Sequence, residues 1–221
     1  MAKSLKTVVL DFYGLPGSGK TTLSHEIAER LTYSSRIVAE PSYDYDHNLN
    51  PICRKLKKLF DSICFGITHF KRFATIVSIV NNYSVLGTGC FSDIINITTK
   101  IAMISRYQKK SDYIVFDEGI AQAAISLVIN NPEKAGNAFQ DICKLLDTPY
   151  YIKLVQVECK RDIALDRVLK RKSKDTRVEK MNSKLEMNHF MKQFEKAIKS
   201  ISEVTTSSSV EHCNCEFLEE L

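Results

Sequence analysis

The segment "GLPGSGKTT", residues 14–22, decides the fold expected for this chain. Gly14 is followed after four residues by Gly19, Lys20 and Thr21, so the segment has the spacing G-x-x-x-x-G-K-T in full. Glycines accept positive φ angles and let the backbone approach a phosphate closely, so that successive N–H groups form an anion-binding nest. An apolar run precedes the segment and the amphipathic stretch "TTLSHEIAERL" follows it. We therefore expect a strand, a phosphate-binding turn and a helix whose N-terminus adds partial positive charge.

The lysine and the threonine of this segment each have a chemical role. In such a turn Lys20 reaches the β and γ phosphates of a nucleotide, and the Thr21 hydroxyl binds Mg²⁺. The segment resembles the phosphate-binding loop of the P-loop NTPases, and motifs farther along narrow the resemblance to the nucleoside and nucleotide kinases. The resemblance implies ATP and Mg²⁺ as cofactors. The predicted cofactor-binding residues are Gly14, Gly17, Ser18, Gly19, Lys20, Thr21, Thr22 and Arg177.

Four strand-like runs alternate with helix-length amphipathic segments. This alternation predicts an α/β fold in which a parallel sheet carries helices on both faces, and the resemblance implies the three-layer α/β/α architecture of the P-loop NTPases. Residues 42–111 contain no clear strand, so we expect a helical, substrate-binding insertion between the second and third strands. The length of 221 residues favours a single domain, 1–221. The strand-like runs lie at 7–13, 36–41, 112–118 and 150–157.

The composition excludes several classes of protein. Hydrophobic residues make up 44% and charged residues 26% of the chain, as in an ordinary globular protein. The apolar run near the N-terminus is too short for a signal peptide and no window reaches 18 apolar residues, so we expect a cytoplasmic protein with no membrane contact. Seven cysteines, an odd number without a C-x-x-C pair, predict free thiols and not a disulfide framework or a zinc ribbon.

The net charge of +5 is concentrated in one stretch. From Lys160 to Lys180 there are nine Lys or Arg residues and four Asp or Glu residues, a local balance of +5, so the rest of the chain is neutral. A protein that binds nucleic acid over its surface spreads its basic residues more widely. The distribution instead predicts one basic element that faces an anion, and no nucleic-acid partner.

The third strand-like run ends in "FDEG", which offers a carboxylate for magnesium. Asp117 follows four mostly apolar residues, and the end of a neighbouring strand is where a carboxylate reaches the phosphates. We predict that Thr21 and Asp117 hold Mg²⁺; an ordinary acid at a strand end is the alternative. Kinases of the resembled branch commonly carry an arginine where this chain has Glu118, so the anion-binding role of that arginine would fall to another residue.

The second strand-like run ends in Glu40 and a proline. Ligands bind beyond the carboxyl ends of strands in a doubly wound sheet, so we expect Glu40 near the γ phosphate. Deoxyribonucleoside kinases are similar here, and the resemblance implies that Glu40 accepts the proton of the acceptor hydroxyl; a solvated acid before a turn is the alternative. Aromatic residues in helices more often belong to the core. The candidate pocket residues in the insertion are Tyr43, Tyr45, Phe65, Phe70 and Arg106.

The basic stretch resembles the lid of these kinases. Asp162 is the expected N-cap of a helix in which Arg167 and Arg171, four residues apart, share one face and can grip the oxygens of a transferring phosphoryl group. Arg177 is a third candidate in a lid at 167–181. A solvated basic helix face is the alternative. The residues expected to be buried in this helix are Ile163, Leu165, Val168 and Leu169.

Together these patterns favour an ATP-dependent phosphotransferase, and the resemblance implies a nucleoside or nucleotide as the small-molecule acceptor. A kinase of a sugar or another metabolite is the alternative among enzymes. A nucleotide-dependent regulatory ATPase is the alternative outside phosphoryl transfer, although the chain has no N-K-x-D or L-S-G-G-Q segment. The sequence leaves a homodimer open. The predicted catalytic residues are Lys20, Glu40, Asp117, Arg167 and Arg171.

Overall fold

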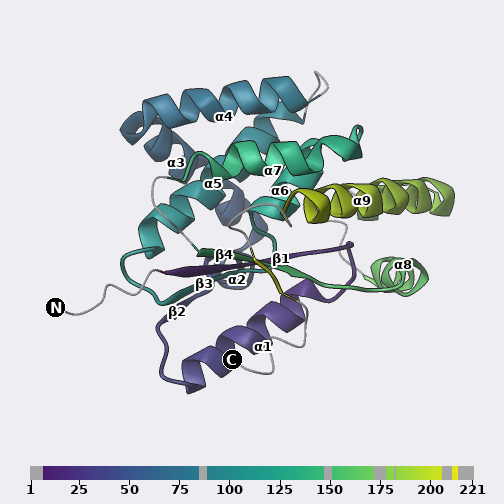
Figure 1. Cartoon of the computed structure of the whole chain (residues 1–221), viewed down its shortest axis with the longest axis horizontal. Coiled ribbons are helices and arrows are strands. Elements are labelled where there is room, and N and C mark those ends of the chain that lie inside the picture. Colours follow the sequence, from purple (N-terminus) through teal and green to yellow (C-terminus); the bar gives the residue numbers. More distant parts are fainter. Residues whose placement is uncertain are drawn as a thin grey trace.

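The centre of the molecule is a parallel sheet with the strand order β2-β3-β1-β4-β5 (Figure 1). The computed structural model describes residues 7–84, 89–146, 151–171, 178–181, 183–205 and 211–213. The α/β prediction and the parallel sheet are confirmed, and each predicted strand-like run contains a strand. The strands are β1 (Val8–Tyr13), β2 (Val38–Ala39), β3 (Tyr113–Phe116), β4 (Tyr151–Gln156) and β5 (Glu211–Cys213).

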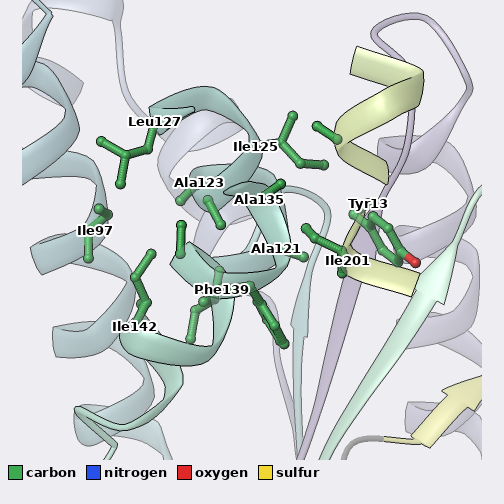
Figure 2. Packing of buried hydrophobic residues seen from close by; sticks show 14 of the residues in the cluster. Tyr13, Ile97, Ala121, Ala123, Ile125, Leu127, Ala135, Phe139, Ile142 and Ile201 are labelled. Atoms are coloured by element: carbon green, nitrogen blue, oxygen red, sulfur yellow. The ribbon is translucent and has the colours of Figure 1, made fainter. Parts of the chain in front are cut away.

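Side chains along the central strand β1 alternate between two hydrophobic clusters, because successive side chains of a strand point to opposite faces of the sheet. Leu10 and Phe12 pack against α1 (Lys20–Tyr33) on one face. Val9 and Tyr13 belong to a larger cluster on the other face, which Figure 2 shows between β1 and the helices that cover it. Helices therefore cover both faces of the sheet, as the alternating pattern predicts.

The described part of the insertion between β2 and β3 consists of four helices joined by short non-helical segments, as predicted. Proline occupies the first turn of both α2 and α3, where its missing N–H has no helical partner to lose. Among the described residues, no single helix has the length and apolarity to cross a membrane; α3 and α4 reach that standard only as a pair, which bends by 119°. The helices are α2 (Pro41–Asn48), α3 (Pro51–Thr68), α4 (Phe70–Tyr83) and α5 (Cys90–Tyr107).

The remaining helices follow β3 and β4. α6 begins three residues after Asp117, and six of its eight residues belong to the larger cluster (Figure 2). α9 runs beside α6 and α7 on the same face of the sheet (Figure 1). The elements are α6 (Ile120–Leu127), η1 (Pro132–Lys134), α7 (Ala135–Cys143), α8 (Arg161–Lys170), η2 (Val178–Lys180) and α9 (Lys184–Thr205).

Helix α8 begins earlier than the sequence predicts. Its N-cap is Lys160, and Asp162 lies in the first turn, so the predicted cap is wrong. Lys160 has an extended backbone, with φ −61° and ψ 136°, and is the last residue before the helix, so that the helix begins at Arg161. The burial prediction is half right: Leu165 is buried, as is Val168, whereas Ile163 is 43% exposed and Leu169 is 48% exposed. Only one side of this short helix packs on the rest of the protein.

Cysteines whose side chains are described form no disulfides, in agreement with the sequence prediction. They are Cys53, Cys64, Cys90, Cys143 and Cys159. Burial raises the pKa of the Cys143 thiol far above its ordinary value, so this residue behaves as an inert apolar side chain.

Candidate functional site

The turn between β1 and α1 wraps around a small space at the carboxyl end of β1. Gly17 has a φ of +83°, and a Cβ at this position would lie 2.4 Å from the carbonyl oxygen of Ala164 in α8. A Cβ at Gly14 would lie 2.6 Å from the carbonyl oxygen of Val157, just after β4. The close approach of the β4–α8 segment therefore requires glycine at both positions. Positive φ angles at Gly14, Gly17 and Gly19 are compatible with the backbone of a phosphate-binding nest.

The lysine of the turn is folded back over it. Lys20 is 5% exposed, and its Nζ donates hydrogen bonds of 3.0 Å to the carbonyl oxygens of Gly14 and Leu15. Burial lowers the pKa of Lys20, and the nearby carboxylates of Glu118 and Asp117 oppose that change. A buried ammonium held by neutral carbonyls is poised to bind an anion, because an anionic oxygen is a stronger acceptor.

Thr21 and Asp117, which are 96 residues apart in the sequence, meet at this turn. The Thr21 hydroxyl donates to Oδ2 of Asp117 at 2.9 Å. The other carboxylate oxygen, Oδ1, is buried without a hydrogen-bond partner among the described residues, and so is the Ser18 hydroxyl in the turn. Buried polar atoms are normally hydrogen-bonded, so both oxygens have capacity left for a ligand. These donors fit Mg²⁺, which typically takes one or two protein oxygens together with phosphate oxygens and water.

A larger protein-only metal centre is not part of this site. In the part of the chain that the structure describes, no group of three or more His, Cys, Asp or Glu side chains is arranged to hold a metal ion.

The end of β3 contributes a residue that sequence reasoning missed. Gln122, in the first turn of α6, is buried, and the backbone N–H of Gly14 points to its Oε1 at 3.5 Å. The sequence could have indicated Gln122 through its position five residues after Asp117, which places it in the first turn of the helix that follows the strand. Glu118, in contrast, is exposed, and so is the predicted cofactor residue Thr22.

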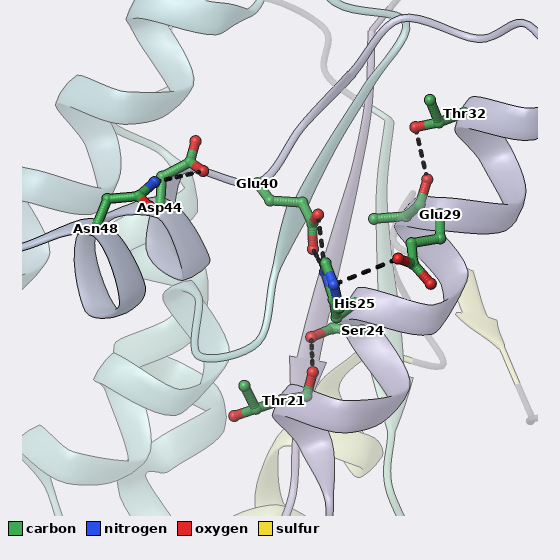
Figure 3. A network of polar contacts seen from close by, with 9 residues as sticks. Thr21, Ser24, His25, Glu29, Thr32, Glu40, Asp44 and Asn48 are labelled. Atoms are coloured by element: carbon green, nitrogen blue, oxygen red, sulfur yellow. Dashed lines mark hydrogen bonds and ion pairs between the residues drawn. The ribbon is translucent and has the colours of Figure 1, made fainter.

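Glu40 lies at the carboxyl end of β2, as predicted, but its carboxylate points to α1. Figure 3 shows His25, one turn after Thr21 on α1, reaching this carboxylate. Nδ1 of His25 lies 3.1 and 3.2 Å from the two oxygens of Glu40 and donates to them. Sequence reasoning missed His25; its signal was a position four residues after Thr21, on the same side of the helix.

The histidine is held from two further sides. Its ring stacks on the Tyr43 ring with a centroid distance of 4.0 Å and an interplanar angle of 7°. Nε2 of His25 lies 3.6 Å from Oε1 of Glu29, one turn farther along α1 (Figure 3). Burial raises the pKa of Glu40, and the hydrogen bond from His25 opposes the rise. The arrangement gives a carboxylate with a fixed orientation.

The basic residues of α8 approach the turn from the opposite side. Nη1 of Arg167 lies 3.4 Å from the carbonyl oxygen of Gly17. Arg171 is the C-cap of α8, which ends at Lys170, and its ψ of 134° turns the following chain out of the helix. Arg171 nevertheless lies close enough for its charge to lower the pKa of Lys20 further.

The rest of the predicted lid is described only in part. Nη1 of Arg171 lies 3.6 Å from Oε1 of Glu179, which is buried in η2. Arg177 lies outside the described residues, and so does most of the segment that would form a lid. The pair of Arg171 and Glu179 joins the two described ends of that segment.

The candidate pocket residues of the insertion have structural roles or are exposed. Tyr45 and Arg106 both contact the carboxylate of Asp61, and the Arg106 contact is 3.1 Å. Phe65 is buried in the larger cluster, whereas Phe70 is 72% exposed. Among the five candidates, only Tyr43 contacts the described part of the site, through its stacking on His25.

A cavity of about 650 Å³ opens beside the turn. Its lining combines Leu15 of the turn, the chain from Gln156 to Lys160 after β4, and four residues of α9. This volume lies within the range of roughly 300–1,000 Å³ that is typical of small-molecule sites. No protein-family model matches this chain, and a search of curated proteins finds no significant match.

Proposed function

We propose that the protein is an ATP-dependent phosphotransferase whose acceptor is a small molecule, with a nucleoside or nucleotide as the favoured class. The observation that carries this proposal is the 2.9 Å contact between Thr21 and Asp117 beside a glycine-lined turn with unpaired buried oxygens. Thr21 at the start of α1 and Asp117 just after β3 are thereby adjacent, beyond the ends of two neighbouring parallel strands, β1 and β3. In a parallel sheet, ligands bind at the carboxyl ends of the strands, where the chain leaves two neighbouring strands toward opposite faces of the sheet. Here α1 follows β1 on one face and α6 follows β3 on the other.

On the donor side, the turn and its lysine would bind the triphosphate. The backbone N–H groups and the N-terminus of α1 neutralise part of its charge, and the ammonium of Lys20 exchanges its carbonyl partners for phosphate oxygens. Mg²⁺ held by Thr21 and Asp117 would supply a further positive charge to the transferring group. Arg167 and Arg171 approach the same turn and would stabilise charge that spreads over the phosphoryl oxygens.

On the acceptor side, Glu40 would remove the proton of the acceptor hydroxyl. Catalysis of phosphoryl transfer depends mainly on the positioning of the reactants and on electrostatic stabilisation. A general base therefore has to be held in a fixed orientation toward the acceptor hydroxyl. His25 provides that orientation, because its Nδ1 holds the carboxylate from the side of α1. The cavity beside Leu15 is large enough for the base of the nucleotide donor.

The first experiment follows labelled γ phosphate from Mg²⁺-ATP into pooled nucleosides, nucleoside monophosphates and sugars. Label in one pool supports the kinase and identifies its acceptor class. Label that reaches only free phosphate, at one rate whatever pool is present, refutes phosphoryl transfer and leaves the regulatory ATPase.

Lys20→Ala is the negative variant, since it removes the buried ammonium. Lys109→Ala is its matched control, because Lys109 is an exposed lysine. Glu40→Gln should spare ATP binding and reduce transfer by more than about tenfold if the carboxylate is the base. An unchanged rate for Glu40→Gln would remove Glu40 from the mechanism.

A further inference from the structure

Helix α3 carries a straight apolar stripe that faces solvent. The α3 stripe consists of Ile52, Leu56, Phe60, Ile63 and Ile67, which are between 52% and 77% exposed. Their spacing of four, four, three and four residues places them on one face, within an arc of about 80°. The helix packs on the protein through its other face, where Asp61, Ser62 and Phe65 are buried. The described part of the chain therefore leaves the apolar face of α3 without a covering layer.

We propose that a second copy of this chain covers the α3 stripe, with the two α3 helices antiparallel across a two-fold axis. An isologous interface of this kind needs a self-complementary patch. The stripe satisfies this condition when the axis passes beside Phe60. Leu56 then lies opposite the partner's Ile63, and Ile52 lies opposite the partner's Ile67. Phe60 meets the same residue of the second copy at the centre, where an aromatic anchor contributes most.

The size of the stripe suits a stable dimer. At roughly 150 Å² for a large apolar side chain, five side chains that are about two-thirds exposed present about 500 Å². A standard interface buries about 800 Å² on each partner, and roughly 60% of that area is apolar. The stripe thus supplies the apolar share, and the polar residues along its sides would supply the rim.

The distribution of charge along α3 selects the antiparallel arrangement. Its four basic residues all lie in the first half; Lys55 and Lys57 flank the stripe, whereas Arg54 and Lys58 project from the opposite side of the helix. The second half contains one charged residue, Asp61, which is buried and pairs with Arg106. A parallel pair would bring the flanking Lys55 and Lys57 of the two copies together, and like charges in contact disfavour association. An antiparallel pair places each basic half beside an uncharged half.

The test measures the mass of the protein in solution across a range of concentrations by sedimentation equilibrium. We expect the wild-type protein to be a dimer at micromolar concentration. Leu56→Glu and Ile63→Lys should each raise the dimer dissociation constant by about thirtyfold or more, since each places a charge in an apolar contact. An equimolar mixture of the two variants should dimerise again. In the mixed dimer the introduced carboxylate of one chain faces the introduced ammonium of the other, while the second contact stays apolar.

Two controls establish whether the effect is specific to the α3 stripe. Leu185→Glu changes an exposed leucine of α9, 81% exposed and outside the stripe, and should leave the dissociation constant unchanged. Circular dichroism should show unchanged folding for every variant, because the substituted side chains are exposed. The proposal goes beyond the proposed phosphotransferase activity and does not depend on it.

Four results would overturn the inference. A wild-type protein that stays monomeric at about 100 µM, a concentration at which interfaces of this size associate, would exclude the dimer. Dimerisation that neither single variant weakens would place the interface elsewhere, and single-variant effects without recovery in the mixture would exclude the antiparallel register. A monomer that sediments with phosphatidylserine vesicles and not with phosphatidylcholine vesicles would assign the stripe and its basic flank to an anionic membrane instead.

Discussion

Asp11 is a carboxyl group in the middle of the sheet, and its burial makes folding depend on pH. It lies on β1 between Phe116 of β3 and Leu154 of β4 in register, and it is 1% exposed. Its Oδ2 accepts a hydrogen bond of 3.0 Å from the backbone N–H of Ala121 at the start of α6. Its Oδ1 is buried and has no hydrogen-bond partner in the described part of the chain. A carboxylate in this position loses its hydration and regains only part of it.

Burial raises the pKa of Asp11 from 3.8 to about 6, although the N–H groups of α6 and the charge of Lys100 oppose the rise. An unfolded chain releases this proton near pH 3.8, whereas the folded protein keeps it until about pH 6. The stabilising contribution is therefore complete below pH 3.8 and is lost as the pH rises through about 6. A difference of about two pH units corresponds to about 3 kcal/mol of unfolding free energy at neutral pH.

The perturbation is Asp11→Asn, which is close in shape and does not titrate. Urea unfolding of the wild-type and variant proteins between about pH 4 and pH 7 gives the difference in unfolding free energy at each pH. We expect the wild-type protein to lose about 3 kcal/mol relative to the variant across this range. Asp162→Asn is the matched control, because Asp162 is exposed.

The reasoning is refuted if wild-type and Asp11→Asn proteins show the same dependence of stability on pH. That outcome would mean that Asp11 ionises near its ordinary pKa, so that α6 and Lys100 fully replace its lost hydration. If the variant does not fold, a carboxyl titration of the wild-type protein by NMR measures the pKa of Asp11 directly and decides the same question.

Two further predictions concern the site. If Glu40 is the catalytic base, its pKa sets the acid limb of the pH–rate profile. His25→Gln should move this limb to higher pH, because the histidine lowers the pKa of Glu40. Glu29→Gln should move the limb to lower pH, because the charge of Glu29 raises the pKa of Glu40. The measurement is kcat/KM as a function of pH. If neither variant shifts the acid limb, the ionisation of Glu40 does not control the rate. Gly17→Ala should destabilise the fold by about 1–2 kcal/mol or more in urea unfolding, because it combines a positive φ with a backbone clash. Gly66→Ala in α3 is the control: its Cβ meets only ordinary contacts, so the change should be neutral or stabilising.

The sequence by itself determined the features that depend on local periodicity. Alternating apolar runs and amphipathic segments predict the parallel sheet and the helical insertion, because strand and helix repeats differ. The glycine spacing of residues 14–22 predicts a tight turn. The structure agrees with this prediction, because no Cβ fits at Gly14 or Gly17. The position of Asp117 at a strand end similarly predicts that it lies near Thr21, since parallel strands end at one edge.

Only the tertiary structure decided which groups face each other across elements. His25 and Glu40 belong to α1 and to the end of β2, and no spacing in the sequence reports that their side chains meet. The helical periodicity of α3 is plain in the sequence, but whether its apolar face is covered depends on the neighbouring helices. Arg171 follows the helical spacing and yet lies beyond the end of α8. A residue pattern specifies the face of an element, whereas packing specifies what that face contacts.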